Sequence, residues 1–440
     1  MSLIVAVDAH SESFTLSLGQ VLAIFYQRNL DLIAAQYNID QSRAEELIAG
    51  AIPNPSVGFQ VSEITGQPNL GANALGCNPN KNVSCGPAEY FSFNQLIEVA
   101  GKRGLRIQSS GFATQAAESD FRDAERIFTN LVKDAYYNLL QMQKNQTLAQ
   151  DITEHYQTIL KANQLRLKSG DISESDFLRV KIEALKSQSE LDAAQATVEQ
   201  AQANLAVILR WPDKSLAFEV QEQWPDIQNI GQNQAKEDLI DTALKQRPDL
   251  EADKQRVAQA EKELALAKRL NYPDVSVTAG YARDPSNNNL DTGFIGFSVP
   301  LPLFYQHQGE TSKASVNLNQ NRLALAQTEL SIRNDVVGAL ATWQSADKIV
   351  HRYQEGILDD ALVIRNSAEL AYSKGATTVL DFIDAQRNYK TIMRDYNAAM
   401  VNRSNAYFDL AKALGTSLDA TPATPPSEFK SAPTPLNGQN

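Results

Sequence analysis

The stretch PDVSVTAGYAR, residues 273–283, alternates apolar side chains with small or polar ones, and PSVGFQVSEI, residues 55–64, does the same. Alternation with a period of two predicts β-strands that each have one apolar face. Each stretch has a partner of similar length further along the chain, at residues 90–98 and 292–300. A tilted strand of ~9–11 residues is long enough to cross a bilayer. The sequence therefore predicts four strands, each with one face suited to lipid and one suited to water.

Most of the remaining chain is predicted to be helical. Prolines are absent from residues 14–52, 99–211, 249–272 and 303–421, and because an interior proline costs a helix ~3 kcal/mol, long helices fit these windows. Within them, apolar residues recur every seven positions, which is typical of coiled-coil seams. The seam positions include Phe121, Phe128, Ala135, Met142 and Tyr156, then Ala184, Val198 and Leu205, and finally Met393, Met400, Tyr407 and Leu414. A helix over residues 102–168 would reach ~100 Å at ~1.5 Å per residue, which is longer than a globular core requires.

The chain repeats its own pattern once. The matching pairs at a spacing of 218 residues include Asp31 and Asp249, Glu45 and Glu263, and Pro55 and Pro273. The matching pairs at a spacing of 205 include Gly170 and Gly375, Asp176 and Asp381, and Leu209 and Leu414. The difference, 218 − 205 = 13, corresponds to a longer loop between the two strands of the first copy. Each copy is thus predicted to run helix, strand, strand, long helix, tip, helix.

This repeat sets the expected domain organisation. We expect residues 14–211 to form the first structural repeat and residues 237–415 the second. Residues 212–236 are expected to be an equatorial linker between the repeats. The N-terminal segment, residues 1–13, is either the remnant of an export signal or a disordered start. Residues 416–440 are rich in Pro, Thr and Ser, which predicts a disordered tail.

Composition excludes several classes of function. The net charge is −12 and no basic stripe is present, which argues against a nucleic-acid partner. No run approaches the ~18 apolar residues that a membrane-spanning helix needs. There is no phosphate-binding glycine loop, no zinc-protease histidine pair and no serine elbow, so we expect no catalytic residues, no cofactor and no resident metal.

Two cysteines, Cys77 and Cys85, lie in the long loop of the first copy. In an oxidising compartment they can close a small disulfide ring. Free thiols are the alternative. A metal site is a third interpretation, but no histidine lies nearby and the spacing matches no zinc pattern.

The small number of strands predicts an assembly. Four strands cannot enclose a lumen, and an open sheet in lipid would leave unpaired backbone groups at its edges. Two chains would give eight strands with a filled interior, whereas three would give twelve strands around water. Small residues on the inward face favour the hollow interior and hence a homotrimer; they are Gly58, Gly280, Ser276 and Ser298. The competing interpretation is a structural coiled-coil scaffold or surface rod, capped by a small sheet in water.

One local motif carries a family resemblance. The segment YSKGATTVLDFIDA, residues 372–385, together with the doubled plan of the chain, resembles the TolC-like outer membrane efflux factors over residues 14–415. The resemblance implies a mainly α fold with a small β part. Long antiparallel coiled-coil helices would form an α-barrel in the periplasm of a Gram-negative bacterium, and four strands per chain would contribute to a 12-stranded trimeric β-barrel in outer membrane lipid. It also implies a passive exit duct, fed by an inner-membrane pump through a periplasmic adaptor.

The resemblance further assigns a periplasmic gate. It implies that Asp381 and Asp384 form carboxylate rings at a closed entrance, with Asp176 beside them. Tyr372 matches the tyrosine of the family's tip, whereas the family's tip arginine, which latches the gate by a salt bridge, is replaced by Thr377. The alternative is that the two aspartates simply stabilise the start of a helix, where acids are favoured by ~0.3–1 kcal/mol.

The exposed turns are the expected docking points for the adaptor. They are Gly170, Asp171, Ile172 and Ser173 in the first copy, and Gly375, Ala376 and Thr378 in the second.

The basic turn GKRGLR, residues 101–106, is similar to the heavy-metal, CzcC- and CusC-like branch of the family. That branch implies efflux of metal cations with a pump of the RND type. A multidrug, other small-molecule or type I secretion duct remains the alternative. With four histidines, four methionines and two cysteines, the chain is poor in soft metal ligands. A conduit that releases ions should not hold them tightly, so this scarcity does not decide between the alternatives.

Overall fold

The computed structural model describes residues 14–62, 88–211, 218–225, 227, 235–284 and 290–416. The fold is mainly helical, with a four-stranded antiparallel sheet and a two-stranded parallel ribbon. The predictions for residues 1–13, for the loop with Cys77 and Cys85, and for residues 417–440 concern segments outside the described residues.

The chain forms two compact units. The first, here called the sheet unit, contains the described parts of residues 37–119 and 250–328. The second, here called the helical unit, contains those of residues 14–36, 120–249 and 329–416.

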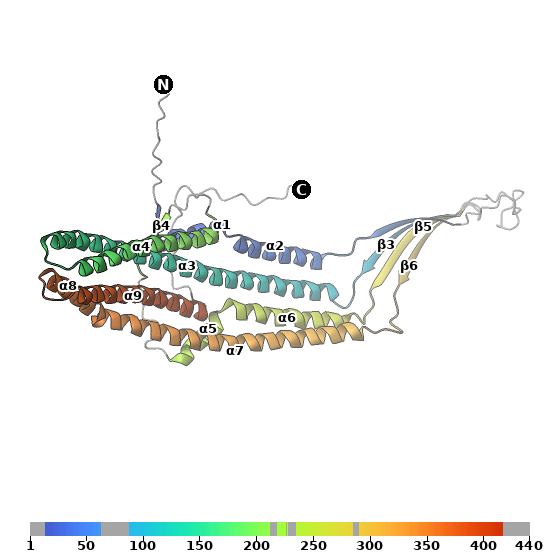
Figure 1. The fold of residues 1–440 in the computed structure, drawn as a ribbon. Coiled ribbons are helices and arrows are strands. Elements are labelled where there is room, and N and C mark those ends of the chain that lie inside the picture. The colour runs from blue at the N-terminus through green and yellow to red at the C-terminus, as the bar shows by residue number, and fades with distance from the viewer. Residues whose placement is uncertain are drawn as a thin grey trace, which may run out of the picture. The chain divides into compact units, whose positions relative to one another are not determined.

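Four strands form the sheet of the sheet unit (Figure 1): β2 (Ser56–Ser62), β3 (Ala88–Ile97), β5 (Val275–Asp284) and β6 (Leu290–Ser298). Their order is β2-β3-β5-β6, and every neighbouring pair is antiparallel. The two copies of the repeat therefore meet in the centre of the sheet, where Phe91 lies opposite Tyr281. This leaves β2 and β6 as the two edges.

The two faces of the sheet differ as the alternation predicted. Residues directly opposite one another on neighbouring strands share a face. On the apolar face, four side chains of the edge strands β2 and β6 are between 64 % and 74 % exposed: Val57, Phe59, Ile295 and Phe297. The small residues of the opposite face include Gly58, Gly280, Ser276 and Ser298. Exceptions on that face include three larger residues: Tyr90, Leu96 and Phe294. The ring of Phe294 covers Gly280 so closely that a Cβ there would lie 2.3 Å from it.

The helices of the sheet unit are parts of α2 (Leu30–Gly50), α3 (Lys102–Ser169), α6 (Pro248–Arg269) and α7 (Gln308–Arg352). Ion pairs join the start of α3 to the neighbouring strand ends. Lys102, whose side chain is 6 % exposed, pairs with Asp274 at 2.9 Å, and Asp274 also accepts the N–H of Val99. Arg106 pairs with Glu98 through two nitrogens. The end of β3 is thereby fixed to the start of α3 and to the start of β5.

The helical unit contains the remaining elements. They are β1 (Phe14–Leu16), α1 (Leu18–Arg28), α4 (Glu174–Leu209), β4 (Phe218–Val220), α5 (Lys236–Gln246), the π-helix η3 (Tyr353–Ile357), α8 (Leu358–Ser373) and α9 (Val379–Leu414). Strands β1 and β4 form a parallel ribbon that the sequence did not predict. Among the described helices, none combines the length and apolarity needed to cross a membrane.

The first predicted helix is in fact two helices. The proline-free window 14–52 predicts one long helix, but α1 ends at Arg28 and α2 begins at Leu30. Asn29 has an extended backbone, and its side-chain oxygen accepts the N–H groups of Asp31 and Leu32, both at 3.0 Å. An asparagine in this role caps a new helix and so divides the window.

The second copy is broken at the equivalent place. Arg247, 218 residues after Asn29, also has an extended backbone, and Pro248 begins α6 there. The helices that precede the two breaks, α1 and α5, have the same length of 11 residues.

The second long helix before the tip is also interrupted. The window 303–421 predicts a helix that is unbroken up to the tip at Gly375, but η3 separates α7 from α8, and Gly356 inside it has non-helical backbone angles (φ 171°, ψ −32°). Glycine is among the weakest helix formers, which favours a break at this residue. The counterpart in the first copy, residues 148–152, has no glycine and lies inside the continuous helix α3.

The predicted seams are correct for two helices and displaced on a third. Val198 and Leu205 of α4, and Tyr407 and Leu414 of α9, are buried. On α3, Tyr156 is buried as predicted, whereas Phe121, Phe128 and Met142 are only half-buried. The fully buried residues of α3 lie on a neighbouring stripe that includes Val132, Leu139 and Leu140. This helix contacts both α1, through Tyr26 and Thr129, and α9, through Asn130 and Asp409, so its core stripe is wider than a two-helix seam.

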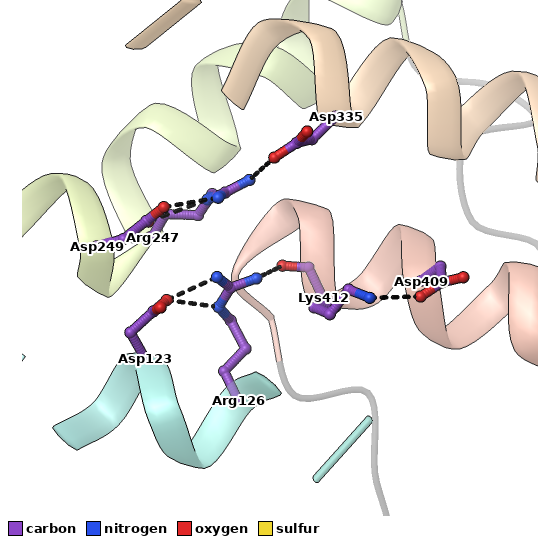
Figure 2. A network of polar contacts seen from close by, with 7 residues as sticks. All are labelled: Asp123, Arg126, Arg247, Asp249, Asp335, Asp409 and Lys412. Carbon is purple, nitrogen blue, oxygen red and sulfur yellow. Dashed lines mark hydrogen bonds and ion pairs between the residues drawn. The ribbon is translucent and has the colours of Figure 1, made fainter. Parts of the chain in front are cut away.

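Two neighbouring groups of polar contacts join elements of the helical unit (Figure 2). Arg247 donates to Asp249 and, at 2.9 Å, to Asp335 of α7. Arg126 of α3 pairs with Asp123 and donates to the carbonyl oxygen of Lys412. The carbonyl of Lys412 also accepts the N–H of Gly415, so Arg126 adds a second hydrogen bond to it, and a cation at the C-terminal end of α9 interacts favourably with the helix dipole. The end of α9 is therefore held to α3, beside the break between α5 and α6.

Beside these contacts, Asp134 should make stability depend on pH. Burial and the nearby Asp409 raise the pKa of Asp134 to about 6, because both disfavour its charged form. A carboxyl whose folded pKa lies above its usual value of 3.8 stabilises the fold fully at pH below 4, and this contribution is lost as pH rises through 6. Asp134→Asn should therefore raise the free energy of unfolding at pH 8 by about 1–2 kcal/mol, after allowance for solvent screening, and change it little at pH 4.

Thermal unfolding in detergent at the two pH values measures this difference. Asp151→Asn, on the exposed side of the same helix, is the control and should show no such pH-dependent gain. An equal gain for Asp134→Asn at both pH values would contradict the prediction.

Candidate functional site

The two helical hairpins end in turns of the same construction, which lie at the same end of the helical unit (Figure 1). Gly170 and Gly375 have φ values of 79° and 71°, in the left-handed region that only glycine adopts without cost. Asp171 donates its N–H to the carbonyl of Arg166 at 2.8 Å, and Ala376 does the same to Ala371 at 2.8 Å. Each turn therefore closes its helix with the same C-terminal cap.

The helices that leave these turns also begin alike. Ser173 caps α4 by accepting the N–H of Asp176 at 3.1 Å, and Thr378 caps α9 by accepting the N–H of Asp381 at 3.2 Å. In return, each aspartate accepts the hydroxyl hydrogen of its cap residue, at 2.8 and 2.7 Å. The spacing of 205 residues thus relates glycine, cap and aspartate in both turns.

The aspartates of the second turn differ in their engagement. Hydrogen bonds from Thr378 and Thr377 lower the pKa of Asp381, because they favour its charged form. Asp384, one helical turn further on, is exposed and makes no hydrogen bond or ion pair with any described residue. The helix-start alternative is thus realised for Asp381, whereas the exposed carboxylate of Asp384 makes no hydrogen bond among the described residues and interacts only electrostatically with Arg387.

Both turns line one cavity of about 660 Å³ within the helical unit. It brings together nine of the residues singled out in the sequence: Gly170, Asp171, Ile172, Ser173, Asp176, Tyr372, Gly375, Thr377 and Thr378. Ala376, Asp381 and Asp384 are not among its lining residues.

Two arginines complete this cavity, and no sequence pattern selected them. Arg166 lies near the end of α3 and Arg179 in the second turn of α4. The guanidinium of Arg166 stands 5.4 Å from the ring centre of Tyr372. The only sequence signal for Arg166 was its position one helical turn before Gly170. Its contact with Tyr372 depends on how one hairpin packs against the other.

A buried aromatic cluster supports the cavity from behind. Phe382, fully buried, stacks on Tyr372 with ring centres 5.1 Å apart and meets Tyr156 edge-on at 6.3 Å. Burial raises the pKa of Tyr372, so its hydroxyl stays protonated. Further along the two hairpins, Arg387 pairs with Glu183 and joins α9 to α4.

Substitution of the second tip glycine should weaken this site. Gly375→Ala places a Cβ on a residue with φ 71°, which costs about 1–2 kcal/mol. We expect a lower midpoint of thermal unfolding in detergent. Gly338→Ala, inside α7, is the control, since no atom lies within 4 Å of its added Cβ. There alanine should stabilise the helix by about 0.5–1 kcal/mol, so effects of the same sign at both positions would contradict the prediction.

The described residues contain no group of three or more His, Cys, Asp or Glu side chains that could hold a metal ion. Cys77 and Cys85 lie outside those residues.

Comparison with known proteins identifies the family. The family profile described as "Outer membrane efflux protein" matches residues 22–209 and 239–416. The chain belongs to the outer membrane efflux protein family. As a member, it is a non-enzymatic transport protein of the Gram-negative outer membrane, a channel of tripartite efflux systems with its helical part in the periplasm.

Individual relatives of the outer membrane efflux protein family are similar at low identity. The cobalt-zinc-cadmium resistance protein CzcC of Cupriavidus metallidurans is 24 % identical over 379 residues, covering 84 % of this chain and 83 % of CzcC. The pyoverdine export protein OpmQ of Pseudomonas putida is 22 % identical, with coverage of 90 % and 85 %. A crystal structure of CusC superposes with a TM-score of 0.75 at 17 % identity, covering 93 % of this chain and 95 % of CusC, and so shows the same fold.

Proposed function

We propose that three copies of this chain form a passive exit duct for heavy-metal cations, delivered by an RND-type inner-membrane pump through a periplasmic adaptor. The observation that carries the duct is the four-stranded sheet, whose edges β2 and β6 pair with no further strand among the described residues and whose apolar face is exposed. In lipid, both features are stable only if β6 of one copy pairs with β2 of the next. Three sheets of four strands would then close around a water-filled lumen.

The chemistry at the hairpin tips supports an entrance that selects for cations. Asp384 is exposed, makes no side-chain hydrogen bond or ion pair with a described residue, and lies one turn inside α9; the nearby Arg387 forms its ion pair with Glu183 instead. In a trimer, three copies of this carboxylate would form a ring that attracts cations and repels anions. Asp381, occupied by its two threonines, would hold the start of α9 beside this ring, with Asp176 in the same role on α4. We therefore assign the gate chiefly to Asp384 and the scaffold of the gate to Tyr372, Thr377 and the two capping aspartates.

The tips themselves are proposed to dock the adaptor. Gly170–Ser173 and Gly375–Thr378 present similar turns around one cavity, and Arg166 and Arg179 add positive charge to its lining, whereas their counterparts at a spacing of 205 residues are Ala371 and Asp384. This pair of arginines is a candidate replacement for the latch of the family, in which an arginine stands at the position of Thr377.

Heavy metals are proposed as the cargo because CzcC, a resistance protein for cobalt, zinc and cadmium, is similar over most of both chains. The similarity to OpmQ, a pyoverdine exporter, favours a small organic molecule as the second candidate.

Growth of a deletion strain separates these cargoes. Heavy-metal export predicts greater sensitivity to cobalt, zinc, cadmium or copper, with unchanged sensitivity to dyes and antibiotics. Restored tolerance from a plasmid copy is the control. Equal metal tolerance in mutant and parent would remove the heavy-metal assignment, and a defect confined to organic compounds would favour the second candidate.

The assembly is tested separately. Chemical cross-linking in native outer membranes should yield a trimer, and recovery of monomers alone would exclude the shared barrel.

A further inference from the structure

The segment that follows β6 exposes an unusual amount of apolar surface. Leu301 is 70 % exposed, Leu303 71 % and Phe304 100 %, while Tyr305 and, across the junction, Tyr272 are each about half exposed. Phe304 is thus a large aromatic ring that no other described residue covers. We call these five residues the junction belt.

The junction belt is continuous with the apolar face of the sheet. Ser298 at the end of β6 pairs with Ser276 at the start of β5, and Val275 pairs with Ile97 at the end of β3. The segments that follow β3 and β6 and the segment that precedes β5 therefore lie at the same end of the sheet. Phe297, on the apolar face and 72 % exposed, lies only four residues before Leu301.

Charge at the same end of the sheet opposes that of the whole chain. Segments 98–106, 268–274 and 299–310 contain five Lys or Arg and three Asp or Glu, a net of 5 − 3 = +2, whereas the chain carries −12. Asp274 is paired with Lys102 and Glu98 with Arg106. Lys268 and Arg269 are exposed at the end of α6 and make no ion pair with any described residue, although Arg269 stands 5.8 Å from the ring of Tyr272.

A polar hollow adjoins the belt. It has a volume of about 470 Å³ and is lined by Asn271, Gln306, Gln308, Thr311, Ser312, Ser315 and Val316. Apolar side chains, aromatic rings and cations beside a polar hollow match the border of a bilayer, where acyl chains meet headgroups.

We propose that the junction belt is a lipid-binding surface for the anionic phospholipids of the periplasmic leaflet. Leu301, Leu303 and Phe304 enter the acyl-chain border, Tyr272 and Tyr305 lie at the headgroup level, and Lys268 and Arg269 bind the phosphates. The proposal rests on the outer membrane duct, because it extends the lipid-facing surface of the sheet to the periplasmic side.

Depth-dependent quenching by brominated lipid tests this surface. Phe304→Trp and, as a reference on the sheet, Phe297→Trp are reconstituted in nanodiscs whose lipids carry bromine near the headgroup end or near the methyl end of the acyl chain. The three native tryptophans lie in the helical unit and are subtracted as the parent signal. We expect the Phe304→Trp variant to lose most of its added fluorescence with headgroup-proximal bromine and much less with methyl-end bromine.

The outcomes separate the two proposals. Quenching of the Phe297→Trp variant without quenching of the Phe304→Trp variant overturns the junction belt and leaves the duct intact. If the unquenched emission of the Phe304→Trp variant is also shifted to the blue, the belt instead packs against a second copy. Lack of quenching in both variants overturns the duct itself.

Charge recognition is measured on the same preparation. Lys268→Gln/Arg269→Gln should weaken retention of anionic lipid by about fivefold for each charge removed, as seen by native mass spectrometry. Lys245→Gln, in the helical unit, is the matched control. Equal retention of phosphatidylglycerol and phosphatidylethanolamine by the parent protein would overturn the proposed anion preference.

Discussion

Phe297→Lys should prevent this protein from forming a stable trimer in the outer membrane. Phe297 lies on edge strand β6, on the apolar face of the sheet, and is 72 % exposed. A lysine on the lipid face of a barrel strand costs about 2–4 kcal/mol at the bilayer midplane and about 0–1 kcal/mol near the interface. Because Phe297 is the second-last residue of β6, we expect a cost of about 1 kcal/mol per chain and about 3 kcal/mol for the three copies in a trimer. We expect loss of the heat-modifiable trimer on gels of outer membranes, and the export phenotype of the deletion strain.

The neighbouring residue provides the matched control. Ser298→Lys introduces the same charge one position later, where the side chain belongs to the opposite face together with Ser276. That face is proposed to line water, so trimer yield should stay close to that of the parent. Equal loss of the trimer for both variants would show that the two faces do not differ in environment and would contradict the lipid-facing assignment.

Phe382→Ala should loosen the hairpin tips and make the closed duct leak. Phe382 is fully buried between Tyr372 and Tyr156, at the point where α9 packs behind the tip cavity. Truncation of a buried phenylalanine costs about 3–5 kcal/mol, because it removes apolar burial and leaves a cavity. We expect a lower unfolding temperature in detergent and, in cells, increased sensitivity to large antibiotics such as vancomycin that the intact outer membrane excludes.

Leu185→Ala is the control for this prediction, since Leu185 lies on α4, does not line the tip cavity and is 61 % exposed. Its effect should be within about 0.5 kcal/mol, as for most exposed substitutions. If both variants excluded large antibiotics equally well and were equally stable, Phe382 would not hold the tips. A stable but leaky Phe382→Ala variant would assign the residue to the gate rather than to the core.

Features that depend on neighbouring residues were readable in the sequence. Gly375 needs a left-handed backbone, and Thr378 with Asp381 forms a reciprocal cap, so the whole turn is encoded within seven residues. The strands were readable for the same reason, because Val275, Val277 and Ala279 fix one face by alternation alone.

Features that depend on distant segments were not readable. Arg166 reaches the tip cavity only because the first hairpin packs against the second, and three-residue strands such as β1 carry no period long enough to detect. The stripe of α3 was displaced because that helix packs against more than one partner. The break at Asn29 is intermediate: its cap on Asp31 and Leu32 is local, but no proline marks it.

The π-helical turn at Tyr353–Ile357 has a mechanical consequence. It interrupts the second long helix of the chain, whereas the first, α3, runs without a break past the equivalent residues. In a ring built from three such chains, continuous α3 helices would alternate with helices interrupted by η3. A force on the ring would then bend the interrupted helices first, at η3, while the continuous α3 helices would keep their shape.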